Sequence, residues 1–88
     1  MSSAHKNLSV FNTEGLPDIS AKKFVIVVAE WNDEVTGALY EGAHKTLLEY
    51  GAKPENIRRV NVPGSFELSF GSQVYAQKPD VDAVIAIG

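Results

Sequence analysis

The apolar residues of this chain form three short runs separated by two stretches with helical spacing. The first run, Phe24–Ala29, holds six apolar and mostly β-branched residues without alternation, which is typical of a strand covered on both faces in a parallel sheet. Spaced apolar residues predict a second strand over 57–62, where Arg58 and Arg59 indicate an edge position. The third run, 81–87, predicts a third strand.

The first helical stretch follows the first strand. Asn32 or Asp33 can cap it, acidic residues suit its positive end, and Gly51 supplies a stop, so we predict a helix over 33–50. The apolar residues that carry this periodicity are Val35, Leu39, Ala43, Leu47 and Tyr50.

The second helical stretch begins after the chain break at 63–64. Phe66, Phe70 and Val74 recur at fourfold spacing and predict a helix that ends near Gln77, before a proline. Gly71 lies inside this helix and weakens it by about 1 kcal/mol relative to alanine. We therefore expect close packing at Gly71.

The alternation of strand and helix predicts an α/β fold with a parallel sheet. Residues 1–22 form an irregular arm rich in polar residues, with Val10, Phe11 and Leu16 as its apolar anchors. Residues 23–88 form the first part of a single domain, because the last strand would otherwise lack a covering helix. We thus expect the 88 residues to belong to a longer fold.

Composition and charge exclude several classes of protein. The net charge is −3, which disfavours a protein dedicated to nucleic acid or to an anionic membrane. There is no cysteine, so disulfides and thiolate metal sites are excluded. No apolar run approaches the roughly 20 residues of a membrane helix, and the first twenty residues lack the apolar core of a signal peptide. We expect a cytoplasmic protein.

Candidate binding groups follow the predicted strands, because ligands of open α/β sheets bind beyond the carboxyl ends of the strands. Trp31 follows the first strand and could stack on a flat ligand or fill the core or a subunit contact; the sequence leaves these alternatives open. Ser65 and Glu67 follow the second strand. They could bind a polyol or an amide-like ring, although plain helix capping is the favoured interpretation from the sequence alone.

Acid–base groups are less evident. His5 lies in the arm and His44 lies in mid-helix beside Lys45, so neither is predicted to be catalytic. The sequence has no glycine-rich phosphate loop and no cluster of metal ligands. The chain therefore offers binding groups without a convincing acid, base or nucleophile, and a standard dinucleotide or Walker site and a metal site are not expected.

Four segments, in order and with matching spacing, resemble the 6,7-dimethyl-8-ribityllumazine synthase family. They are VIVVAEWN (25–32), LYEGA (39–43), VNVPGSFEL (60–68) and DAVIAIG (82–88). The resemblance covers 24–88, its most specific piece is VPGSFEL, and the arm matches only loosely. It implies a flavodoxin-like, three-layer α/β/α fold that is incomplete here.

The resemblance also implies a reaction of riboflavin biosynthesis. In this family, 5-amino-6-(D-ribitylamino)uracil condenses with 3,4-dihydroxy-2-butanone 4-phosphate, releasing phosphate and water, without cofactor or metal. By position, Trp31 would stack on the pyrimidinedione, and Ser65, Phe66 and Glu67 would bind the ribityl chain and the ring. The arm, through Phe11 and Leu16, would contact a neighbouring subunit of a homopentamer or of an icosahedral shell of twelve pentamers.

The family's proton-shuttling histidine belongs to a loop that would lie beyond Gly88, so we assign no catalytic residue here. The 88 residues alone are expected to give no useful turnover. One alternative is a non-catalytic flavin- or lumazine-binding assembly protein on the same scaffold. An unrelated flavodoxin-like domain, such as a response regulator, is disfavoured because Glu30 is followed by Trp31 rather than by an acidic cluster.

Overall fold

The computed structural model describes residues 16–88. Three strands form one parallel sheet in the order β2-β1-β3, with β1 in the middle. The elements in chain order are β1 (Phe24–Ala29), α1 (Asp33–Glu49), a 3₁₀ turn η2 (Pro54–Asn56), β2 (Ile57–Val62), α2 (Ser65–Ala76) and β3 (Ala83–Ile87). The predicted bounds of the first strand are confirmed, and the first helix ends one residue earlier than predicted.

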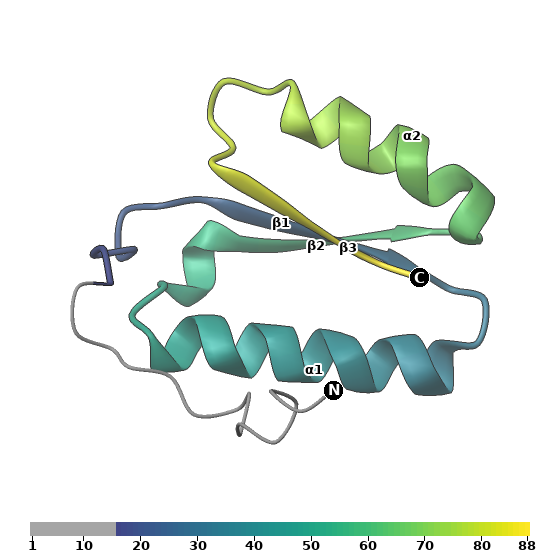
Figure 1. Ribbon diagram of the computed structural model, residues 1–88, viewed down its shortest axis with the longest axis horizontal. Helices are drawn as coiled ribbons and strands as arrows, with labels where there is room; N and C mark the ends of the chain where they lie inside the picture. The colour runs from purple at the N-terminus through teal and green to yellow at the C-terminus, as the bar shows by residue number, and fades with distance from the viewer. Residues whose placement is uncertain (1–15) are drawn as a thin grey trace, which may run out of the picture.

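The two helices cover opposite faces of the sheet, α1 below it and α2 above it in the view of Figure 1. This arrangement confirms the expected α/β class and the partial three-layer, flavodoxin-like architecture. It also explains the unbroken apolar run of β1, because a central strand between two helix layers has no solvent face.

The core is built around β1, whose residues from Val25 to Ala29 are all buried. Alternate side chains point to opposite faces of the sheet and form two clusters. The cluster on the α2 side contains Val25, Val27, Ala29, Val62, Leu68 and Tyr75; the cluster on the α1 side contains Ile26, Val28, Ile87, Tyr40, Ala43 and Leu47.

The edge position predicted for the second strand is confirmed within the three described strands. Arg58 and Arg59 are both exposed and lie against tyrosines of different helices. The guanidinium of Arg58 lies 5.2 Å from the ring centroid of Tyr75 in α2, and that of Arg59 lies 4.4 Å from the ring of Tyr40 in α1. The two arginine side chains therefore extend from opposite faces of β2, one toward each helix.

The apolar stripes predicted for the helices are only partly the buried ones. On α2, Phe66, Phe70 and Val74 are exposed, whereas Leu68 and Tyr75 pack on the sheet. The fourfold spacing correctly predicts a helix, but it does not identify the face that is buried.

The same difference is seen on α1. Val35 and Leu39 are half-exposed, and Tyr40, Ala43 and Leu47 pack on the core. Of the apolar residues at helical spacing, Val35 and Leu39 therefore do not belong to the buried face of α1. The side of α1 that faces the sheet instead carries Thr36 and Tyr40, each one residue further along the chain.

The close packing expected at Gly71 is confirmed. A Cβ atom built on Gly71 would lie 3.2 Å from Cγ1 of Val62 and 3.4 Å from Cγ1 of Val27. Both valines belong to the buried cluster under α2. The missing side chain thus allows the helix to approach the strands at this point.

Residues 16–23 lead into β1 without helix or strand. The Ser20 N–H donates to the Asp18 carboxylate at 2.9 Å, and this hydrogen bond lowers the pKa of Asp18 below its usual value. The anchor Leu16 is exposed, while the other anchors, Val10 and Phe11, and also His5, lie outside the described residues.

The third strand begins two residues later than predicted, at Ala83. Asp82 instead ties the start of β3 to the start of β1: its N–H donates to the Lys23 carbonyl at 2.8 Å, and its carboxylate accepts from the Lys23 N–H at 2.8 Å. These bonds fix the amino ends of the two strands side by side.

Candidate functional site

The carboxyl ends of the three strands meet at one edge of the sheet. Ala29 at the end of β1 pairs with Val62 at the end of β2, and Val28 pairs with Ile87 of β3. The segments that follow, 30–32, 63–67 and Gly88, therefore start from the same edge. The predicted convergence of these segments is confirmed.

Two backbone hydrogen bonds join the first two segments. The Glu30 N–H donates to the Val62 carbonyl at 2.7 Å, and the Trp31 N–H donates to the Pro63 carbonyl at 3.2 Å. Trp31 is thereby held beside the turn that leads into α2. Its side chain is 77% exposed, so the indole does not fill the core of the described chain.

The turn after β1 is shaped by Asn32 and supported by Thr36. Asn32 has φ 62° and ψ 50°, the left-handed conformation that asparagine tolerates better than most residues. Thr36 is only 2% exposed, and its hydroxyl donates to the Ala29 carbonyl at 2.9 Å. The last carbonyl of β1 is thus tied to the first turn of α1, just below Trp31.

The expected position of the α1 cap is confirmed, but its side chain does not close the helix. Asn32 occupies the N-cap position but makes no side-chain capping bond. Its carbonyl accepts the Val35 N–H at 3.0 Å, as a left-handed turn permits, and the acidic residues of the first turn, Asp33 and Glu34, lie where they were expected. The backbone, rather than a side chain, closes this end of the helix.

The capping interpretation of Ser65 is wrong. Gly64 occupies the N-cap position of α2, and Ser65 is the first helical residue, with no side-chain capping bond. Ser65 is exposed, and its hydroxyl has no hydrogen-bond partner among residues 16–88. The hydroxyl is therefore available to a ligand at the helix start.

Glu67 folds back over the start of α2. Its Oε1 lies 3.5 Å from the position that a Cβ atom on Gly64 would take. A carboxylate in the first turn complements the partial positive charge of the helix terminus, as expected from the sequence. Because the Glu67 side chain is exposed, it can also accept hydrogen bonds from a bound hydroxyl.

The end of β3 borders the same turn. A Cβ atom on Gly88 would lie 2.7 Å from Cδ2 of Leu68 and 3.7 Å from Cβ of Ser65. Only a residue without a side chain fits here while Leu68 stays in place. The strand end thus reaches the helix start directly, and Phe66, 92% exposed, projects from this start.

The segments at this edge of the sheet accordingly carry an indole, a hydroxyl, a carboxylate and a benzyl side chain, and the first N–H groups of α2 start from the same edge. These groups can stack on a ring and hydrogen-bond a polyol. Among residues 16–88, no three His, Cys, Asp or Glu side chains gather as metal ligands would. None of the helices in the same part of the chain is long and apolar enough to cross a membrane.

Comparison with known proteins identifies the family. The sequence profile of 6,7-dimethyl-8-ribityllumazine synthase matches residues 21–88. The chain belongs to the 6,7-dimethyl-8-ribityllumazine synthase family. Curated relatives with that name match along the whole chain: the protein of Cytophaga hutchinsonii is 57% identical, that of Phocaeicola vulgatus 50% and that of Parabacteroides distasonis 49%.

The chain spans about half the length of these lumazine synthases. It covers 55% of the Cytophaga hutchinsonii and Parabacteroides distasonis proteins and 52% of the Phocaeicola vulgatus protein. The resemblance inferred from VPGSFEL and its flanking strands is therefore confirmed at the level of the family.

Thr36 is the residue of this edge that sequence reasoning missed. The signal was present, because Thr36, Tyr40, Ala43 and Leu47 recur at spacings of four, three and four. This stripe, rather than the one beginning at Val35, faces the sheet. A polar residue on the buried stripe of a helix points to a hydrogen bond at the end of the neighbouring strand.

Proposed function

We propose that the complete protein catalyses the condensation of 5-amino-6-(D-ribitylamino)uracil with 3,4-dihydroxy-2-butanone 4-phosphate to 6,7-dimethyl-8-ribityllumazine. Membership of the lumazine synthase family supports the reaction. The observation that supports this site is the hydrogen bond between the Trp31 N–H and the Pro63 carbonyl, which holds the backbone of Trp31 beside the segment that leads into α2.

In this proposal, the indole of Trp31 stacks on the pyrimidinedione ring. Stacking of a heterocycle on an aromatic side chain contributes about 1–3 kcal/mol per ring by the precedent of nucleobases. Ser65 and Glu67 bind the ribityl hydroxyls and the ring edge, and Phe66 borders the ring. Since these groups bind and orient rather than transfer protons, they contribute to the rate by holding two substrates in register.

The proton-transfer groups and the phosphate site of the main reaction are assigned to the part of the relatives' length that this chain does not span. The proposed enzyme uses no cofactor and no metal, and we place it in the cytoplasm. The names of the relatives support an enzyme. No observation supports the non-catalytic alternative.

We further propose that the protein works as a homo-oligomer, a pentamer or a shell of pentamers, with the arm 1–22 on a neighbouring subunit. The exposed stripe of Phe66, Phe70 and Val74 along α2 supports self-association, because adjacent apolar side chains on a surface mark interaction sites.

The test is direct. The complete protein, incubated with the two substrates, should form a product with the absorbance and fluorescence of a lumazine and release inorganic phosphate. The spontaneous reaction of the same substrates without protein is the blank. A rate no higher than this blank would refute the proposed activity and leave the non-catalytic alternative.

A further inference from the structure

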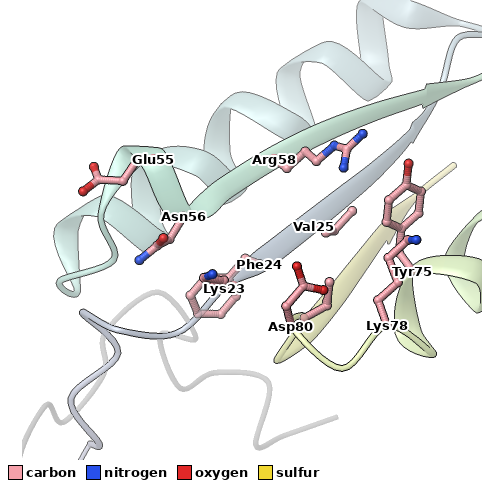
Figure 2. Close-up of a pocket in the computed structure, with 10 residues that line it drawn as sticks. Lys23, Phe24, Val25, Glu55, Asn56, Arg58, Tyr75, Lys78 and Asp80 are labelled. Atoms are coloured by element: carbon pink, nitrogen blue, oxygen red, sulfur yellow. The ribbon is translucent and has the colours of Figure 1, made fainter.

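A cavity of about 200 Å³ lies at the opposite edge of the sheet, by the amino ends of β1 and β2. Figure 2 shows it between β2, β1 and the end of α2. It does not involve Trp31, Ser65, Phe66 or Glu67. Its lining consists of Lys23, Phe24, Val25, Glu55, Asn56, Arg58, Tyr75, Lys78, Asp80 and Val81.

Two cations of this lining lie against one aromatic ring. The Arg58 guanidinium is 5.2 Å and the Lys78 Nζ is 5.7 Å from the ring centroid of Tyr75. The ring attracts both cations, while the two cations repel each other. Within residues 16–88, neither has a carboxylate partner or a hydrogen-bond acceptor for its side chain. Both cations are therefore available to an anion.

Arg59, the next residue on the same strand, has a hydrogen-bond acceptor that Arg58 lacks. Arg59 lies over Tyr40 as Arg58 lies over Tyr75, but its Nε also donates to the Asn61 side chain at 2.9 Å. Arg58 has the ring contact without such an acceptor. All of its N–H donors are therefore available to a ligand.

The charge of the lining favours an anion. The lining contains three cationic residues, Lys23, Arg58 and Lys78, and two carboxylates, Glu55 and Asp80, whereas the whole chain has a net charge of −3. Figure 2 shows the Glu55 carboxylate directed away from Arg58. The lining thus carries one more cation than carboxylates on an acidic protein, and Asp80 and Glu55 are the opposing charges within it.

We propose that this cavity binds a phosphate group, either inorganic phosphate or the phosphate end of a small monoester. The planar fork of Arg58 matches two phosphate oxygens, and Lys78 adds a mobile point charge. The volume lies below the roughly 300–1,000 Å³ of pockets for larger organic ligands, so the phosphate itself is the recognised part. This site is independent of the proposed lumazine chemistry.

Calorimetric titration of the complete protein tests the proposal, with inorganic phosphate and glycerol 3-phosphate as separate probes at low ionic strength. Arg58→Gln should raise the dissociation constant of the probe at this cavity by at least about tenfold, and Lys78→Gln should raise it less. Arg59→Gln removes the same charge from the same strand on the other face and should leave binding unchanged. Equal affinity for both probes identifies phosphate itself, whereas tighter binding of glycerol 3-phosphate identifies a monoester.

The sign of the charge effect provides a second test. Asp80→Asn should strengthen phosphate binding, because it removes the opposing carboxylate from the lining. Thermal unfolding of each variant checks that the fold is kept, and Lys78 is exposed beyond the end of α2, so its variant leaves the core intact. The proposal is overturned if neither probe binds, if Arg58→Gln and Arg59→Gln weaken binding equally, or if Asp80→Asn weakens it. Phosphate bound at the other edge of the sheet, beside Trp31 and Ser65, would keep its affinity in Arg58→Gln. Calorimetry would count it as an additional molecule of phosphate bound per chain.

Discussion

At the scale of single residues, the packing of α2 on the sheet depends on a side chain that is absent. Gly71 faces Cγ1 of Val62 and Cγ1 of Val27, the two valines beneath the middle of the helix. An added methyl group would lie 3.2 Å from the Val62 atom, which is tighter than ordinary contact, and 3.4 Å from the Val27 atom, at the lower limit of ordinary contact. Because these valines are held in the buried cluster, they have little room to move.

We therefore expect Gly71→Ala to lower the free energy of unfolding by about 1 kcal/mol. The overpacking cost of roughly 1–3 kcal/mol exceeds the gain of about 1 kcal/mol in helix propensity. Gly42 in α1 is the matched control: a Cβ atom there would have nothing within 4 Å, so Gly42→Ala should stabilise by about 0.5–1 kcal/mol. Urea denaturation measures both variants. Equal stabilisation by both would contradict the close approach at Gly71.

At the scale of elements, the sequence predicts the order, type and approximate bounds of the strands and helices. The bounds of β1 are predictable because six consecutive apolar and mostly β-branched residues, flanked by polar ones, are typical of a strand between two covering layers. The convergence of the strand ends follows from parallel pairing alone. The general place of the candidate site could therefore be found without a structure.

The caps and the buried face of α2 could not be predicted in the same way. Fourfold spacing is shared by Phe66, Phe70 and Val74, yet the sheet contacts Leu68, Gly71 and Tyr75. Periodicity determines a helix, whereas the face that packs depends on the neighbouring layer. Asn32 is the N-cap of α1 as predicted, whereas Gly64 takes the N-cap position of α2 in place of Ser65. Neither helix has a side-chain capping bond, because the backbone conformation of each turn determines which groups can reach the helix end.

The exposed stripe of α2 leads to a prediction about assembly. In the complete protein, Phe70→Lys should convert the oligomer into smaller species in sedimentation velocity, because it places a charge in the proposed apolar contact. Ser69→Lys adds the same charge on an exposed flank of the helix and should leave assembly unchanged. Loss of stability without a change in assembly would show that another part of the chain, and not a second copy, covers the stripe.

At the scale of the whole molecule, the described residues form one side of the proposed binding edge. Its parts come from three chain segments, yet two backbone hydrogen bonds between the β1 and β2 ends and the contact at Gly88 hold them together. Rigid placement of binding groups by a sheet edge is what a reaction between two positioned substrates requires. The central claim is that Trp31 is a binding residue of this edge and not a structural one.

The most direct measurement of that claim compares the affinity of the complete protein for 5-amino-6-(D-ribitylamino)uracil with its stability in the same variants. Trp31→Ala should weaken binding by about tenfold or more, since it removes a stacking surface. Trp31→Phe keeps a flat ring and should bind nearly as the wild type does. Because the indole is 77% exposed, both variants should unfold within about 0.5 kcal/mol of the wild type. Unchanged affinity in Trp31→Ala, or a loss of stability with affinity retained, would contradict the account.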